Sequence, residues 1–418
     1  MSLATDTQTS PDPATETSLG HAMSEYWSRV RGGDLGSLPA VLGLIVLIIF
    51  FTVLQGATFF SAFNFANLVS QAAMIIVLAM GLVFVLLLGE IDLSAGFAAA
   101  TAAAVLAVTL TEKGWALPLA LLACLGTGVV IGLAIGLLVA RLGIPSFVVT
   151  LAMFLALQGV VLLIIGEGGT IGIDNEFILA IQNKNLTPLA GWILYVVVVG
   201  GYALISGLTL RRRKAAGLIH EAVSVWAAKV ITLAVLYGAV TFFLNQERSR
   251  RPELTSIQGV PYIVPLILVL LIVLTFVLSK TAFGRHVYAV GGNAEAARRA
   301  GINVPGIKIA CFIACSTLAA VAGILFASRD NSVSPSTGGS TTLLFAVAAA
   351  VIGGTSLFGG RGKISDAVIG GLVIGVIANG LPLITSQAGI QFVVTGLVLL
   401  IAASVDALSR KRSAAVGR

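Results

Sequence analysis

The chain has 418 residues, of which 57% are hydrophobic and only 10% are charged. Soluble proteins carry about 25% charged residues, so this composition excludes an ordinary water-exposed surface. A net charge of +7 would suggest nucleic acid as the partner of a soluble protein, but the basic residues here stand in short clusters between apolar runs. Such clusters are typical of the loops of membrane proteins, and we expect no nucleic-acid partner.

Residues 1–38 differ in composition from the rest of the chain. They are rich in Ser, Thr, Asp and Pro, and they lack the apolar core that a cleaved signal peptide requires. We expect a disordered cytoplasmic tail here, followed by a transmembrane domain over residues 39–409. Residues 410–418 form a basic tail that we also expect in the cytoplasm.

Apolar runs recur along the transmembrane domain. A helix needs roughly 20 apolar residues to cross a bilayer, and these runs therefore predict an all-α polytopic transmembrane bundle of about twelve spans, within a range of ten to twelve. A re-entrant path for some runs stays open. The runs are 40–55, 66–88, 93–111, 116–140, 146–165, 191–210, 222–244, 261–279, 309–327, 341–358, 364–385 and 390–408.

The distribution of Lys and Arg predicts the orientation of the bundle. With the N-terminus inside, the inner segments hold 18 of the 25 basic residues and the outer loops hold 6, while Lys229 lies within a run. Because cytoplasmic loops retain basic residues in excess, we expect both termini in the cytoplasm. Arg248, Arg250 and Arg251 stand on the predicted outer side, against this rule.

A weak internal repeat relates two short loops, 89–95 and 360–366, each of which joins two apolar runs. We expect two tight helical hairpins whose loops lie on the same face of the membrane. Their charges either pair across the two halves of the bundle or remain solvated. The charges are Glu90 and Asp92 in the first loop and Arg361 and Lys363 in the second.

Small residues predict where helices pack closely. Glycines four apart lie on one face of a helix, and in a bilayer such faces let two backbones approach each other. We expect the cysteines within the apolar runs to act in the same way, as small packing residues. The glycines are Gly128, Gly132, Gly136, Gly371 and Gly375, and the cysteines are Cys124, Cys311 and Cys315.

Residues 280–308 are unusually long and polar for a predicted inner loop. Asn293 suits an N-cap, the alanine-rich stretch after it favours a short helix, and Gly301 suits the left-handed residue that ends one. Glu295 stands three and four residues before Arg298 and Arg299, which gives the helix a charged side. Two readings stay open: a segment that docks on a soluble partner, and an amphipathic connector on the lipid headgroups.

Three stretches of this sequence together resemble the permease subunits of carbohydrate ABC importers. They are LLGEIDLSAG (87–96), FGRHVYAVGGNAEAARRAGINVPGIK (283–308) and AVIGGTSLFGGRGKISDAVIGGLVIG (350–375), and the resemblance extends from about residue 64 to residue 408. It implies a multi-pass subunit of the bacterial cytoplasmic (inner) membrane that binds no cofactor of its own. It also implies a partner ATPase that uses ATP, an extracytoplasmic sugar-binding protein and a permease homodimer.

The same resemblance assigns roles to individual residues. Within 280–308, the residues that would face the ATPase are Gly291, Gly292, Asn293, Glu295, Ala296, Ala297, Ala300 and Gly301. The other two stretches supply the motif loops, with Glu90, Asp92, Gly353, Gly354, Gly359 and Gly360.

An added region near residues 200–260 distinguishes this chain from the ten-span, ribose-type members of that family. It contains RRRKAAGL and a further apolar run, and it resembles xylose-type permeases. The resemblance therefore implies xylose or a related monosaccharide as the substrate.

The residues supply no catalytic chemistry of their own. GTSLFGGRGKIS (354–365) fails as a phosphate-binding loop, because Leu357 stands where the first glycine belongs and Lys363 precedes Ile364. His21, His220 and His286 are too widely separated to predict a metal site. We therefore expect a non-enzymatic subunit whose energy comes from the partner.

A neutral sugar needs hydrogen-bonding groups along its path, and polar groups within a membrane are functional candidates. Amides can equally bridge helices, so both roles stay open for five residues. They are Asn67, Gln71, Gln158, Asn379 and Gln391.

Two other functions remain possible at this stage. An ion-coupled secondary transporter of a small polar solute would need charged residues near the bilayer centre, whereas the acidic residues here flank the apolar runs. These are Glu90, Asp92, Glu167, Asp366 and Asp406. A membrane scaffold or receptor would use the polar loop for docking alone.

Overall fold

The computed structural model describes residues 38–218, 220–398, 400 and 404. The predicted N-terminal tail, apart from Leu38, and the predicted C-terminal tail lie outside the described residues, as do His21 and Asp406.

The described part of the chain contains ten helices that are long and apolar enough to cross a membrane. This confirms the all-α polytopic bundle, at the lower end of the predicted range of spans. The ten are α2 (Leu38–Gln55), α3 (Ala62–Leu87), α4 (Ala95–Ala107) continued by the π-helix η1 (Val108–Glu112), α5 (Leu117–Ala140), α6 (Ser146–Ile165), α8 (Pro188–Ala215), α9 (Val223–Leu244), α10 (Ile263–Lys280), α13 (Val304–Asp330) and α15 (Ile364–Ile384).

Shorter elements complete the bundle. They are β1 (Ile171–Gly172), α7 (Glu176–Asn183), α11 (Ala282–Gly292), α12 (Ala294–Arg299), β2 (Ser332–Val333) and α14 (Gly339–Gly353). The predicted run 341–358 corresponds to α14, whose 15 residues reach only about 22 Å at 1.5 Å per residue. This length is too short to cross a hydrocarbon core of about 30 Å. The last predicted run, 390–408, is described only in part and contains an apolar helix, Ala388–Val398.

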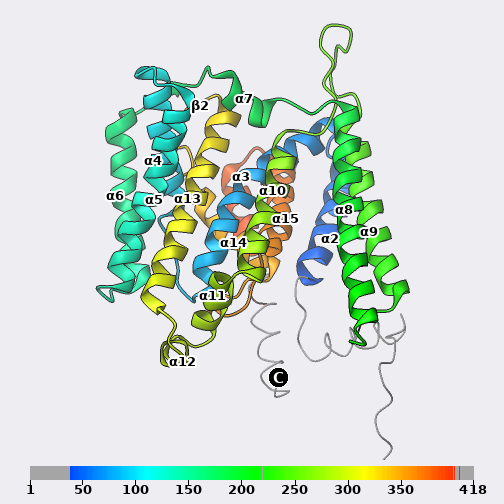
Figure 1. Ribbon diagram of the computed structural model, residues 1–418. Coiled ribbons are helices and arrows are strands. Elements are labelled where there is room, and N and C mark those ends of the chain that lie inside the picture. Colours follow the sequence, from blue (N-terminus) through cyan, green and yellow to red (C-terminus); the bar gives the residue numbers. More distant parts are fainter. Residues whose placement is uncertain (1–37, 219, 399, 401–403, 405–418) are drawn as a thin grey trace, which may run out of the picture.

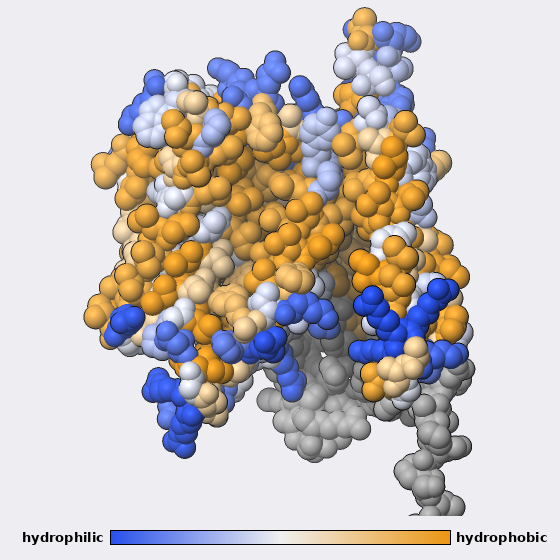
Figure 2. All heavy atoms as spheres, viewed as in Figure 1, coloured by the Kyte–Doolittle hydropathy of each residue, from blue (hydrophilic) through white to orange (hydrophobic). Residues whose placement is uncertain are grey.

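The long helices run between two ends of the bundle (Figure 1). Helices α11 and α12 lie at one end, named here the α12 end, and α7 lies with the small strands at the other, named the α7 end. Hydrophobic residues cover the sides of the bundle, and hydrophilic residues gather at both ends (Figure 2). This distribution is the one that a bilayer requires of a spanning protein.

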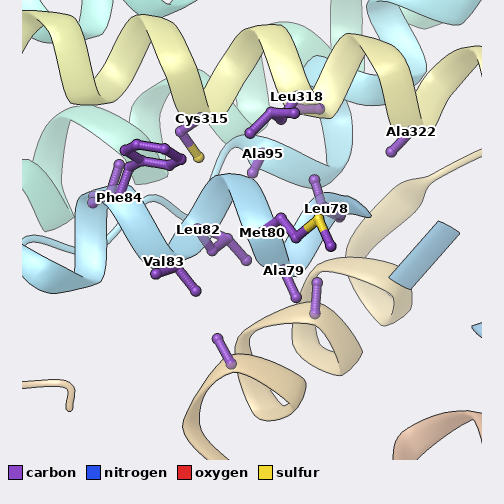
Figure 3. Packing of buried hydrophobic residues seen from close by; sticks show 14 of the residues in the cluster. Leu78, Ala79, Met80, Leu82, Val83, Phe84, Ala95, Cys315, Leu318 and Ala322 are labelled. Carbon is purple, nitrogen blue, oxygen red and sulfur yellow. The ribbon is translucent and has the colours of Figure 1, made fainter. Parts of the chain in front are cut away.

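Helix α3 forms the centre of the bundle and packs between α13 and α15. On its α13 side, a Cβ atom on Gly81 would lie 3.0 Å from the carbonyl oxygen of Cys315 and 3.1 Å from Leu318 Cβ. Figure 3 shows Cys315 and Leu318 directed from α13 toward α3. The three cysteines are all buried, which confirms their predicted packing role.

The predicted glycine stripes form two of the closest helix contacts. On α5, a Cβ atom on Gly128 or Gly132 would lie 2.5 Å from a carbonyl oxygen of α13, and one on Gly136 would lie 2.8 Å from Ile309 Cα. On α15, Gly371 lies against Ile76 and Gly375 lies against Ala72 of α3. These contacts confirm the packing role of both stripes.

Two helices begin partway along the length of the bundle instead of at one of its ends. Ala95, the first residue of α4, lies near Cys315 (Figure 3), which is about 16 Å along α13 from its start at 1.5 Å per residue. Helix α14 begins beside it, because a Cβ atom on Gly96 would lie 2.5 Å from the carbonyl oxygen of Gly339. The chain reaches α14 through Gly338, whose φ of +80° favours glycine.

Helices α8 and α9 form a hairpin at the edge of the bundle, beside α2 (Figure 1). Gly191 is the only buried residue of α8, and α9 buries only Thr241 and Leu244. Both helices therefore expose most of their apolar surface to what surrounds the bundle, which in a membrane is lipid. The loop 245–262 follows α9 and projects at the α7 end.

A single carboxylate organises the loop 245–262. Glu247 accepts hydrogen bonds from the backbone N–H groups of Arg248, Ser249 and Ile257 at 2.8–3.0 Å, and from the side chains of Ser256 and Gln258. These bonds, the one from Ser256 above all, lower the pKa of Glu247 from 4.5 to about 2. The exposed loop therefore has a fixed conformation of its own.

We predict that Gly132→Ala destabilises the bundle, because its Cβ atom would meet Phe312 O at 2.5 Å and Ile313 Cα at 2.6 Å. Overpacking of this kind costs about 1–3 kcal/mol. Thermal unfolding in detergent measures the loss. Gly126→Ala is the matched control, because Gly126 lies on the same helix with nothing within 4 Å. Equal melting temperatures for the two variants would contradict the packing of α5 on α13.

We predict that the loop 245–262 loses its order in acid. The folded-state pKa of Glu247 is lowered, so its contribution is complete above pH 4.5 and is lost as the pH falls toward 2. Hydrogen exchange at the Ile257 amide, which donates to Glu247 Oε1 at 3.0 Å, measures the change. Glu247→Gln should exchange faster at neutral pH and show no acid transition. An unchanged pH profile in that variant would rule out this carboxylate as the cause.

Candidate functional site

The three stretches that carry the family resemblance meet at the α12 end. The Gly360 N–H donates to the Leu87 carbonyl oxygen at 2.8 Å. A Cβ atom on Gly359 would lie 2.8 Å from Gly89 N and 2.9 Å from Gly291 O, and one on Gly291 would overlap Leu87 O. The backbones of the three stretches are therefore in direct contact at a place where only glycine fits. We call Gly89, Gly291, Gly359 and Gly360 the glycine junction.

Helix α12 projects from this junction and has the predicted form. Asn293 caps it, because its Oδ1 accepts a hydrogen bond from Ala296 N at 2.9 Å. Gly301 follows it with a φ of +84°. Glu295 pairs with Arg298 at 3.3 Å and with Arg299 at 3.2 Å, and all three side chains are more than half exposed. The helix thus presents a charged surface away from the bundle.

The eight residues expected to face a partner divide into two groups. Ala297 is buried against its own chain, and Gly291 is held in the glycine junction, so neither presents a side chain outward. The Ala297 side of the short helix packs on the bundle near the start of α13, so a role for Ala297 in facing the ATPase stays a prediction. The exposed members are Gly292, Asn293, Glu295, Ala296, Ala300 and Gly301.

The acidic residues of the loop 88–94 do not pair with Arg361 or Lys363. Glu90 forms an ion pair with Lys308 in the first turns of α13, and both side chains are mostly buried. Asp92 accepts hydrogen bonds from Ser94 N at 2.8 Å and Ser94 Oγ at 2.6 Å at the start of α4. Of the two open readings, pairing across the two loops is not found: Glu90 pairs with α13 instead, and Asp92 bonds to Ser94 just before α4.

The loop 354–363 folds back on the start of α15. Asp366 accepts from the Lys363 backbone at 2.7 Å and from Thr355 Oγ1 at 3.3 Å, and Gly353 packs on the Asp366 backbone. Gly354 ends α14 with a φ of +125°. This loop lies between two helices, whereas a phosphate-binding loop follows a strand.

Tyr288 joins α11 to the same loop. Its hydroxyl group donates to the Gly362 carbonyl oxygen at 2.7 Å. Burial, together with the nearby Asp366 carboxylate, raises the pKa of Tyr288, so the hydroxyl group keeps its proton and remains a donor. Nothing in the sequence alone identified Tyr288 or Lys308 as part of this site, because their partners are distant along the chain.

The five candidate pathway amides lie in different environments. Asn379 is buried and exchanges hydrogen bonds of 2.8 and 3.1 Å with Asn64, so it bridges α15 to α3 and is not free for a sugar. Gln391 donates to Thr385 O at 2.8 Å. Gln158 is exposed on α6.

Asn67 and Gln71 lie one turn apart on α3, and both are half-buried. Among the described residues, neither side chain has a hydrogen-bonding partner, so these two amides stay candidates for the pathway.

We predict that the Glu90–Lys308 pair is an energetic link between α13 and the loop 88–94. Glu90→Lys and Lys308→Glu should each lower thermal stability, because each leaves two like charges in a mostly buried place. The double variant should recover a coupling energy of about 0.5–3 kcal/mol. Reversal of the exposed pair Glu295–Arg298 is the control and should change stability by less than about 1 kcal/mol. Additive losses in the double variant would show that the pair is not coupled.

Comparison with known proteins places these features in a family. The model of the family described as "Branched-chain amino acid transport system / permease component" matches residues 64–403. The xylose transport system permease protein of Escherichia coli (strain K12) is 34% identical over 399 residues, which is 95% of this chain and 98% of the relative. The corresponding protein of Haemophilus influenzae is 35% identical over 384 residues, 92% of this chain and 99% of the relative.

The ribose import permease protein of Escherichia coli (strain K12) is 31% identical over 367 residues, 88% of this chain and 92% of the relative. No solved structure matches the chain significantly. The matches cover the motif loops, α12 and nearly all the spans. The chain belongs to the branched-chain amino acid transport system / permease component family, and it is a multi-pass permease of the bacterial cytoplasmic membrane.

Proposed function

We propose that this chain is the membrane-spanning subunit of an ATP-driven importer that carries xylose or a related monosaccharide. The relatives named for xylose cover more than nine-tenths of the chain at 34–35% identity, and the relative named for ribose import is 31% identical. An ion-coupled transporter has less support, because the relatives are named as permeases of transport systems and Glu90 is neutralised by Lys308.

The observation that carries the proposal is the exposed charged helix α12 fixed to the glycine junction. In this reading the α12 end is cytoplasmic, and an ATPase subunit binds Asn293, Glu295 and Ala296. Movement of α11 and α12 on ATP binding then reaches α3 through Leu87 and α15 through Gly360. The ATP itself is bound and hydrolysed by the partner, and this chain contributes no catalytic group.

The remaining partners follow from the same reading. An extracytoplasmic sugar-binding protein delivers the sugar at the α7 end, and two copies of the chain enclose one pathway. Asn67 and Gln71 supply free amides for sugar hydroxyl groups, and the starts of α4 and α14 lie within the bundle, where transporters often place a substrate site.

The direct test is sugar uptake by proteoliposomes that contain this chain with the ATPase and binding protein encoded beside it. Xylose, ribose and fructose are supplied in turn with Mg-ATP and no ion gradient. Uptake of xylose above the other two supports the proposal in full. Uptake that follows an imposed ion gradient without ATP would overturn it.

We predict that Glu295→Arg weakens association with the ATPase and lowers sugar uptake at least tenfold, because it reverses the charge on the exposed face of α12. Co-purification with the ATPase and uptake are measured at equal membrane expression. The matched control is Glu176→Arg, because Glu176 also stands exposed in the first turn of a short, Asn-capped helix, α7, at the opposite end. Normal ATPase association in Glu295→Arg, or equal loss of association in Glu176→Arg, would refute the coupling role.

A further inference from the structure

The hairpin of α8 and α9 holds a polar pocket at its α12 end. The pocket has a volume of about 330 Å³ and is enclosed by both helices and the turn between them. Figure 2 shows hydrophilic residues gathered at this end of the hairpin, below otherwise apolar sides. Its polar and aromatic lining includes Ser206, Thr209, Arg213, Glu221, Trp226 and Lys229.

The charges around this pocket favour an anion. Lys229 pairs with both oxygens of Glu221 at 2.7 Å, so these two charges cancel. Arg213 adds a positive charge to the lining, and the last turn of α8 also carries Arg212. The local field is therefore positive, and the hydroxyl group of Thr209 adds a polar group to the same wall.

The depth of Lys229 needs an explanation. It stands six residues after the start of α9, which is about 9 Å along the helix at 1.5 Å per residue. A cation at that depth on an apolar helix is costly and marks a functional site by default. The side chains of Lys229 and Glu221 are each about half exposed, so a ligand can reach them from the surroundings of the hairpin.

A shallow apolar groove lies next to the pocket on α9. It has a volume of about 420 Å³, and Lys229 lines both hollows. Its other walls include Val225, Ala228, Leu233 and Leu236. A charged pocket and an apolar groove that share Lys229 match a molecule with an anionic head and a hydrocarbon chain.

The surroundings of the hairpin identify the class of that molecule. Helix α8 buries only Gly191, so this face meets the bilayer. Trp226 donates to Ser206 Oγ at 2.9 Å and so fixes an indole ring beside the pocket, at the level where membrane proteins place tryptophan. Basic pockets between helices at this level bind anionic lipid headgroups.

We propose that this pocket and groove bind an anionic phospholipid, with its phosphate group at Arg213 and Lys229 and one acyl chain along Val225–Leu236 of α9. The bound lipid bridges the inner ends of α8 and α9 and anchors a hairpin that makes few contacts with the rest of the bundle. The proposal requires only that the chain spans a membrane, so it stands apart from the sugar and from the ATPase.

The test uses the full-length purified chain in nanodiscs that contain phosphatidylcholine with a small fraction of phosphatidylglycerol. Native mass spectrometry after mild delipidation counts the retained phosphatidylglycerol. We expect one tightly retained molecule, and at least a tenfold loss of retention in the double variant Arg213→Gln, Lys229→Gln. Arg141→Gln with Lys280→Gln is the matched control, because both residues are exposed and basic at the same end. An equal loss in this control, or equal retention of phosphatidylcholine by the native chain, would reduce the site to general charge attraction and overturn the proposal.

A third variant separates lipid binding from the stability of the ion pair. Glu221→Gln removes the same pair as Lys229→Gln but leaves the cation, so it should retain phosphatidylglycerol at least as well as the native chain. Loss of the lipid in Glu221→Gln would show that the pair is only structural. Inorganic phosphate, added at millimolar concentration, should not displace the lipid, because it cannot fill the groove. Complete displacement would indicate a site for a soluble anion and overturn the proposal.

Discussion

The carbonyl oxygen of Leu87 is the contact on which the functional end of this permease depends. It belongs to the last turn of α3, where helix carbonyl groups have no partner within the helix. A buried carbonyl group without a partner costs about 1–3 kcal/mol, and here the Gly360 N–H supplies the bond at 2.8 Å. Gly291 packs on the same oxygen, so α11 and the loop before α15 are both fixed to α3 at one point. Any side chain on Gly291 would separate all three.

The burial of side chains differs between the centre of the bundle and the hairpin of α8 and α9. Helices α3, α4 and α13 hold the buried centre, and the glycine and alanine surfaces between them bring the backbones together, as lipid supplies little hydrophobic force. The hairpin of α8 and α9 has no such surface and touches the bundle lightly. Its position must then depend on what lies around it, which is why a polar pocket at its α12 end is informative. The central helices are held by close backbone contacts, whereas the hairpin of α8 and α9 exposes most of its surface to the membrane.

The sequence predicted those features that depend on neighbours along the chain. The apolar runs, the Asn293 cap, the turn at Gly301 and the glycine stripes all follow from local spacing, and the structure confirms each of them. Features that depend on distant partners were not predictable in this way. To predict such contacts one must know which helices pack together. Examples are the ion pair of Glu90 with Lys308 and the hydrogen bonds of Asn379 with Asn64. The run 341–358 was extended too far because Leu357 and Phe358 were counted with it, whereas α14 ends at Gly353 and Gly354, with a φ of +125°, stops the helix.

The Glu90–Lys308 ion pair lies only a few residues along the chain from the start of α4, so it connects the α12 end to the interior of the bundle. Only Ile91 separates Glu90, which is paired with Lys308 of α13, from Asp92, which accepts hydrogen bonds from Ser94 just before α4. Helix α12 packs on the first turns of α13, and the turn between them is closed by the Ile302 N–H, which donates to Ala297 O at 3.0 Å. Under the proposed function, a displacement of α12 passes to the base of α13, then through the ion pair to the place where α4 and α14 begin side by side. Because packed helices shift between discrete arrangements instead of deforming continuously, a small movement at the surface can change the contact between these two helix starts.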